Sequence, residues 1–133
     1  MKTIELDLKN KSVLVTGGNR GIGLAIALGF AGEGANVAIC GRDQGALQSA
    51  KGQISALGVK AHAIAADLFT AEGCTQAIEE TASTLGGLDI LVSNASTNIG
   101  GTLETLSDEQ ALERVMGKTL AAMRLSRASL PHL

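Results

Sequence analysis

The stretch SVLVTGGNRGIGLAIALGF, residues 12–30, carries an apolar run on each side of a glycine-rich turn. Residues 12–16 are typical of a short strand that is buried on both faces. After the turn the apolar spacing becomes that of a helix, whose inner face we predict to hold Ile22, Ala25, Ile26, Gly29 and Phe30. Because glycine is entropically costly in regular structure, the turn must be very tight or must let a ligand approach the backbone.

The rest of the chain repeats this alternation of strand and helix. Further strands are expected at 36–40, 59–67 and 88–95. Further helices are expected to begin after the capping residues Asp43, Thr70 and Ser107. This order predicts an α/β fold, a doubly wound parallel sheet of the Rossmann type with helices on both faces. No linker or repeat divides it, so residues 1–133 are expected to form one domain.

Each glycine of the turn has a distinct expected purpose. Gly17 makes the tight exit from the strand, Gly21 leaves room for a phosphate, and Gly23 lets the helix pack closely on the sheet. The helix would then present unpaired N–H groups and its positive dipole end to an anion. The alternative is a glycine-rich turn that binds no ligand. The predicted strand before the turn and the predicted helix after it argue against this alternative.

Composition excludes several function classes. The formal net charge of −2 argues against nucleic acid or an anionic membrane as partner, and no apolar stretch approaches the length of a membrane span. Cys40 and Cys74 lack metal-ligand spacing and are too few for a disulfide framework, so we expect buried thiols in a reducing cytoplasm. The chain has no tyrosine, so a mechanism that needs a tyrosine proton donor cannot run on these residues alone.

Several motifs, in order and at matching intervals, carry a family resemblance. The spacing T-G-x-x-x-G-x-G beginning at Thr16 is followed by GANVAICGRD, AADL, LVSNAS and LERVMGKTLAAMRLSRASLPHL. Together they resemble the short-chain dehydrogenase/reductase family from Ser12 to Pro131. The resemblance implies an oxidoreductase that transfers a hydride between a nicotinamide cofactor and a carbonyl or alcohol.

The resemblance also implies roles for single residues. The backbone around the turn would cradle the pyrophosphate, Asp67 and the Leu68 N–H would contact adenine, and Asn94 and Ala95 would line the adenosine ribose. The alternatives are that Asp67 caps the approach to a helix and that Asn94 only holds loop backbone. The full cofactor-binding set is expected to be Gly17, Asn19, Arg20, Gly21, Ile22, Gly23, Arg42, Asp67, Leu68, Asn94 and Ala95.

The form of the cofactor is expected to be NADP(H) rather than NAD(H). A carboxylate at the end of the second strand would favour NAD, and the resemblance puts Gly41 there. Arg42 and Arg20 could instead grip a 2′-phosphate. Two solvated surface arginines are the alternative. Asp43 could reach a ribose hydroxyl, although it is better explained as a helix cap.

The resemblance stops short of the family's chemistry. The family's serine and its Tyr-x-x-x-Lys pair lie beyond residue 133 in family members, and Thr119 stands at the family's asparagine position. The chain thus matches the N-terminal half, through the fourth strand and its following helix. Two functions follow: the cofactor-binding part of such an enzyme, inactive alone, or a naturally short, non-catalytic module for dinucleotide binding or subunit association.

A homo-oligomer is also expected. The strand 88–93 would have an unpaired edge. The helix over 107–130 is predicted to bury an apolar face, and in the resembled family this helix packs against its mate in another subunit. That face comprises Leu112, Val115, Met116, Thr119, Leu120 and Met123.

Overall fold

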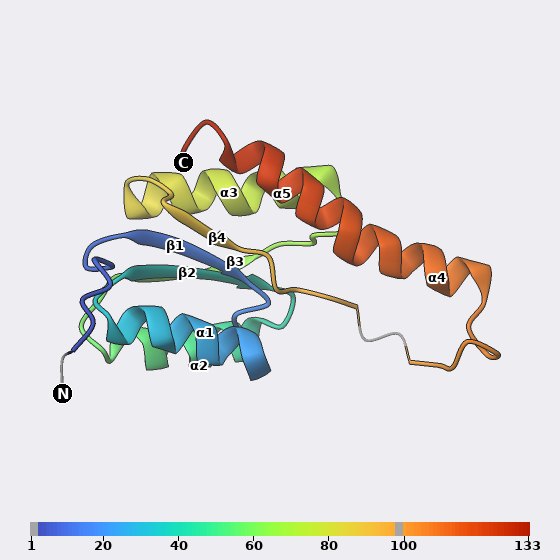
Figure 1. Cartoon of the computed structure of the whole chain (residues 1–133), viewed down its shortest axis with the longest axis horizontal. Helices are drawn as coiled ribbons and strands as arrows, with labels where there is room; N and C mark the ends of the chain where they lie inside the picture. The colour runs from blue at the N-terminus through green and yellow to red at the C-terminus, as the bar shows by residue number, and fades with distance from the viewer. Residues whose placement is uncertain (1–2, 98–99) are drawn as a thin grey trace.

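The computed structural model describes residues 3–97 and 100–133. Its centre is a four-stranded parallel sheet in the order β3-β2-β1-β4, with helices on both faces (Figure 1). The strands are β1 (Ser12–Thr16), β2 (Asn36–Gly41), β3 (Ala61–Ala65) and β4 (Ile90–Val92). The predicted α/β fold with a doubly wound sheet is confirmed.

The order in which strands are added to the sheet changes side at β1: β2 and β3 follow on one side of it, and β4 pairs on the other. Strand β1 pairs on one side with β2, Thr16 opposite Cys40, and on the other side with β4, Val15 opposite Val92. The loops that leave β1 and β4 therefore diverge at their carboxyl ends, which is where open α/β sheets bind ligands. β4 is an edge strand of the described sheet, as predicted.

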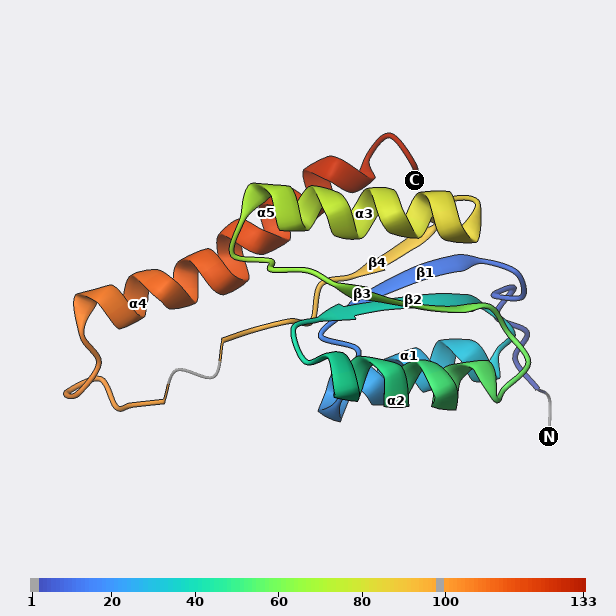
Figure 2. The ribbon, with the colours of Figure 1, turned by 180° about the vertical axis from the view of Figure 1, so that it is seen from behind.

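Helices cover the sheet in two layers. Helices α1 and α2 lie on one face and α3 and α5 on the other, in both views (Figures 1 and 2). Helix α4 extends beyond the body of the sheet and buries none of its residues. The helical bounds are α1 (Gly21–Gly32), α2 (Gln44–Ser55), α3 (Ala71–Leu85), α4 (Asp108–Arg114), the π-helix η1 (Val115–Leu120) and α5 (Ala121–Ser129).

The side chains of the sheet divide between two cores, because successive strand residues point to opposite faces. Val13, Val15 and Ile39 pack against α1 and α2. Leu14 and Ile64 pack against α3 and α5. Every residue of β1 is buried, which confirms the strand predicted for residues 12–16.

The helix starts are also as predicted. The side chain of Asp43 accepts a hydrogen bond from the backbone of α2, and that of Thr70 does so for α3. Ser107 and Gln110 form a reciprocal capping box at α4. The strands 59–67 and 88–95 were predicted too long, because their ends leave the hydrogen-bonded ladder and turn into loops.

The predicted inner face of the first helix is only partly right. Ile26 and Phe30 pack against the core, but Ala25 and Gly29 are exposed. Ile22 is 75% exposed, and the fully buried residues are Gly23, Ala27 and Ala31. Helix α1 is apolar nearly all round, so periodicity did not distinguish its faces. Small residues at intervals of four let its backbone lie close to the sheet, and Leu24 and Phe30 flank that line of contact, partly buried.

The predicted buried face of the last helix is wrong. Leu112 is 60% exposed and Val115 51%. The physical reason is that mainly small side chains face inward, so the helix backbone lies close to the neighbouring α3, and Leu112 and Val115 point elsewhere. The helix runs through three segments, and its buried residues are Gly117, Ala121, Leu125 and Ser129.

Candidate functional site

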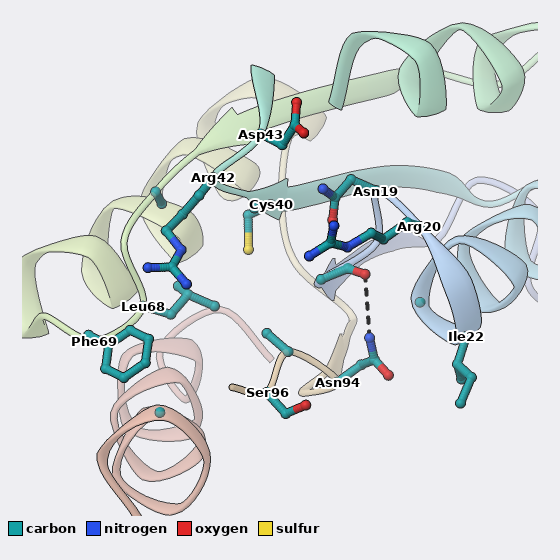
Figure 3. Close-up of a pocket in the computed structure, with 16 residues that line it drawn as sticks. Asn19, Arg20, Ile22, Cys40, Arg42, Asp43, Leu68, Phe69, Asn94 and Ser96 are labelled. Atoms are coloured by element: carbon teal, nitrogen blue, oxygen red, sulfur yellow. Dashed lines mark hydrogen bonds between the residues drawn. The ribbon is translucent and has the colours of Figure 1, made fainter. Parts of the chain in front are cut away.

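A cavity of about 510 Å³ opens at the carboxyl ends of the strands (Figure 3). Its walls come from the loops after all four strands and from η1. This is the position that the divergence of the loops after β1 and β4 predicts. The lining residues are Gly17, Asn19, Arg20, Ile22, Gly23, Cys40, Gly41, Arg42, Asp43, Ala66, Leu68, Phe69, Asn94, Ala95, Ser96 and Gly117.

The structure brings most of the predicted site residues to this cavity. Gly21 and Asp67 are the exceptions, since neither lines it. Gly21 is the first residue of α1, and Asp67 is exposed beside the cavity. The predicted residues that do line it are Gly17, Asn19, Arg20, Ile22, Gly23, Arg42, Leu68, Asn94 and Ala95.

The glycines of the turn are required for different reasons. Gly17 and Gly21 have φ of +65° and +56°, the left-handed region that disfavours other residues. Gly23 is required for space, because a Cβ there would lie 2.1 Å from the carbonyl oxygen of Gly17. The turn is therefore tight, and it is open at Gly21, where a Cβ would have no atom within 4 Å.

Asn94 and Thr16 hold the turn against the loop after β4. The Asn94 side-chain amide donates to the carbonyl of Thr16 at 3.1 Å. It also donates more weakly to the carbonyl of Gly17 at 3.4 Å, the bond that Figure 3 marks with a dashed line. The buried Thr16 hydroxyl accepts from the backbone N–H groups of Asn94 and Ala95 at 2.9 and 3.0 Å. These contacts fix the relative position of two walls of the cavity.

The amino end of α1 lacks the side-chain cap that the starts of α2, α3 and α4 have. Its N-cap residue, Arg20, makes no side-chain hydrogen bond to the first turn. The N-cap side chains of α2, α3 and α4 do make one. An uncapped helix start at a cavity leaves backbone N–H groups and a positive dipole end for an anion.

A cationic corner lies at the end of β2. Arg20 and Arg42 both line the cavity there, and both are exposed. A Cβ added to Gly41 would lie 3.0 Å from the side-chain oxygen of Asn19, so a carboxylate at that position would displace Asn19. The carboxylate of Asp43 accepts from the Ala46 N–H at 3.0 Å, which confirms its predicted role as a helix cap.

The loop after β3 supplies the opposite wall. One carboxylate oxygen of Asp67 accepts from the Phe69 N–H at 3.0 Å, so the side chain stabilises its own loop. The Leu68 side chain lines the cavity and belongs to the core beneath α3. Asp67 therefore stabilises the approach to α3, the structural role that was the alternative to adenine recognition. The bond to the Phe69 N–H uses Oδ1 and does not involve Oδ2.

Five further residues line the cavity for which no cofactor-binding role was expected from the sequence: Cys40, Ala66, Phe69, Ser96 and Gly117. A glycine inside a helical pattern was an available signal for Gly117, because such a glycine commonly marks a close packing contact. Cys40, Ala66 and Ser96 lie within motifs that carry the resemblance, but the resemblance implied no role for them. Phe69 lies in none of these motifs. Burial raises the pKa of the Cys40 thiol to about 12, against the opposing hydrogen bond with the Gly17 backbone, so this thiol is protonated at neutral pH.

The position expected to replace the family's asparagine does not face the cavity. Thr119 is exposed on the π-helical segment. The neighbouring Lys118 reaches the loop after β4 instead, its Nζ 3.5 Å from the carbonyl oxygen of Asn94. Among residues 3–97 and 100–133, no cluster of three His, Cys, Asp or Glu side chains could hold a metal ion.

The strand order and the uncapped glycine turn define a Rossmann-type α/β fold. The family model for short chain dehydrogenases matches residues 11–133. The chain belongs to that family, as the motif resemblance indicated.

Relatives and solved structures agree with this assignment. General stress protein 39 of Bacillus subtilis is 45% identical over 89 residues, which is 66% of this chain and 31% of that protein. A short chain dehydrogenase from Burkholderia cenocepacia, solved with NADP, superposes with a TM-score of 0.90 at 38% identity over 95% of this chain and 52% of that one. L-Sorbose reductase from Gluconobacter frateurii, solved with NADPH and L-sorbose, superposes with a TM-score of 0.90 at 36% identity. The match covers 96% of this chain and 49% of that one.

The match covers the N-terminal part of these proteins. The chain spans between about a third and about half of the length of the curated relatives it matches. Within the part of the chain that the structure describes, no helix is both long enough and apolar enough to cross a membrane.

Proposed function

We propose that these residues are the NADP(H)-binding part of a short-chain oxidoreductase that transfers a hydride between a nicotinamide cofactor and a carbonyl or alcohol substrate. The observation that carries the proposal is the uncapped start of α1 at the cavity. The NADP and NADPH in the two similar solved structures support it. The whole of residues 1–133 is proposed to act as one dinucleotide-binding domain.

The residues present fit a dinucleotide. Gly17, Gly21 and Gly23 add no side chains to the turn, and a Cβ at Gly21 would have no atom within 4 Å, so free space lies beside the backbone at the start of α1. The backbone of Gly17, Gly21, Ile22 and Gly23 would hold the pyrophosphate through N–H groups and the helix dipole. When bound, the cofactor supplies the hydride; the residues of this chain bind and orient it.

The adenosine end would lie between the loops after β2, β3 and β4. Asp67 and the Leu68 N–H would recognise adenine, and Ala95 with the loop that Asn94 holds would line the ribose. Asn19, Arg20 and Arg42 would surround the 2′-phosphate, which favours NADP(H) over NAD(H). Gly41 supports this, because it contributes no carboxylate to repel a phosphate.

Calorimetric titration of the chain with NADP⁺ and with NAD⁺ tests the proposal. Two charge-assisted contacts are worth roughly 2–4 kcal/mol before solvent screening. Since both arginines are exposed, we expect a discounted preference of about ten-fold for NADP⁺. Equal affinities would contradict the arginine assignment, and no binding of either at millimolar concentration would contradict the proposed function.

The complete hydride transfer needs groups outside these residues. The chain contains no tyrosine, and a proton-transfer group typically contributes about 10²- to 10⁴-fold to rate. We therefore expect the 133-residue chain, verified by mass, to show no dehydrogenase turnover. Cofactor-dependent turnover above background with a panel of ketones and aldehydes would contradict this expectation.

A second candidate is a non-catalytic module for subunit association. It is favoured by the free edge of β4 and by Leu112, Val115 and Met123, which are large, apolar and about half exposed or more. The occupant of this helix face would be a second copy of the chain, in a twofold contact. Sedimentation at tens of micromolar is expected to give an oligomer, and a well-folded monomer would contradict it.

The free thiols of Cys40 and Cys74 support a reducing, cytoplasmic location.

A further inference from the structure

The ring of Phe69 lies beside Arg42 at the cationic corner of the cavity. Arg42 directly follows β2 and Phe69 follows β3, so two neighbouring strands bring them together. The guanidinium carbon of Arg42 is 5.4 Å from the ring centroid (Figure 3). That distance is within the range of a cation–π contact. Because the phenylalanine ring carries no net charge, the contact orients the Arg42 guanidinium and leaves its positive charge unpaired by this neighbour.

The backbone of Phe69 is fixed at both of its polar groups. Its N–H donates to Asp67 Oδ1 at 3.0 Å. Its carbonyl accepts from Arg124 Nη1 on α5 at 3.2 Å. The ring therefore stands on a segment tied to its own loop and to the helix layer above the sheet.

Gly117 fixes the ring from the helix side. A Cβ at this position would lie 2.9 Å from the Phe69 Cζ and 3.0 Å from its Cε1, so the ring packs against helix backbone where a side chain would otherwise stand. Gly117 is the buried residue of the π-helix. Its missing side chain and the bonds to Asp67 and Arg124 together restrict how far the ring can move from Arg42.

We propose that Phe69 is a positioning residue, which holds the Arg42 guanidinium ready for the 2′-phosphate of the cofactor. The inference rests on the proposed function and extends it to a residue with no polar contact to the ligand. A free arginine side chain loses much rotamer freedom when it is immobilised on a ligand, and this loss weakens binding. Stacking on a fixed ring removes part of that loss in advance.

The test measures a ratio of affinities, that of 2′-phospho-ADP-ribose over that of ADP-ribose. Phe69→Leu is expected to lower this ratio by roughly two- to five-fold, the range for an exposed cation–π contact. Phe69→Tyr keeps the ring and should retain the ratio. Phe30→Leu is the matched control, since Phe30 lies on α1, partly buried against the other core, and should leave the ratio unchanged. Phe69→Met, a second ring-free variant, tests the same point if Phe69→Leu does not fold.

A double variant separates positioning from general structure. On an Arg42→Gln background, Phe69→Leu should lower the ratio no further, because the two residues act together. An unchanged ratio in Phe69→Leu, or an equal loss with and without Arg42, would overturn the inference while the proposed function stands. Failure of the unmodified chain to bind either ligand would contradict the proposed function as well, so the two failures are distinguishable.

Discussion

The turn between β1 and α1 and the helical run from α4 to α5 use glycine and small residues in the same way but present opposite surfaces. At the turn, Gly23 lets backbone pack on backbone, and what remains open is polar: uncapped N–H groups and two arginines. Along the last helix, Gly117 and Ala121 allow close packing, and what remains open is apolar: Leu112 and Val115.

This difference indicates different missing occupants. A polar concave surface with free N–H groups suits a charged small molecule. A convex helix face with large apolar side chains suits another protein surface. Among residues 3–97 and 100–133, no side chain caps the N–H groups of α1, and Leu112 and Val115 stay more than half exposed. Each region can be tested by changes that affect one and not the other.

The largest expected effect contrasts buried and exposed leucines of the last helix. Leu125 is 1% exposed, so Leu125→Ala should destabilise the fold by about 2–5 kcal/mol. Leu112→Ala, a matched change on the open face, should alter monomer stability by no more than about 0.5 kcal/mol. Urea unfolding monitored by circular dichroism measures both. Equal losses would show that the open face is packed in solution, and sedimentation of Leu112→Ala would then report whether a second copy packs there.

The next effect contrasts two glycines of α1. A Cβ at Gly23 would collide with backbone, so Gly23→Ala should destabilise by about 1–3 kcal/mol and weaken dinucleotide binding. Gly29 has no atom within 4 Å of such a Cβ, and Gly29→Ala should stabilise by about 0.5–1 kcal/mol. Thermal unfolding of the two variants decides, and a stable Gly23→Ala protein with full ligand affinity would contradict the close packing of turn and helix.

A smaller effect follows from Cys40, which is buried directly behind the turn. Burial raises the pKa of its thiol to about 12 from an ordinary value of 9.0. The folded state therefore keeps a proton that the unfolded state releases, so this contribution to stability is complete below pH 9 and is lost as the pH rises toward 12. The slope is at most about 1.4 kcal/mol per pH unit.

Unfolding free energies at pH 8 to 11 measure that slope. The Cys40→Ala variant should have a shallower decline than the unmodified chain. Because the chain has no tyrosine, thiolate absorbance can be followed without phenolate overlap. Parallel pH profiles for the two proteins, or thiolate formation by Cys40 in the folded state near pH 9, would contradict its burial.

Features set by neighbouring residues could be predicted from the sequence, whereas features set by packing between distant segments could not. The helix starts at Asp43, Thr70 and Ser107 were predictable, because each cap bonds to residues three positions away. The glycine turn was predictable because its tightness is local. The faces of α1 and of the last helix were not, because apolar residues surround α1 and because small side chains, not large ones, make the contacts. The Phe69–Gly117 contact was not predictable, since it depends on how a distant helix meets a loop.

The central claim is that the open N–H groups of α1 bind the pyrophosphate of a dinucleotide, and amide NMR of the ¹⁵N-labelled chain tests it most directly. On titration with NADP⁺, the amide signals of Gly21, Ile22 and Gly23 should shift and saturate. The amides of residues 71–73, at the capped start of α3, serve as the internal control and should shift much less. Saturable shifts confined to residues outside the β1–α1 turn, or no shifts at millimolar NADP⁺, would contradict the account.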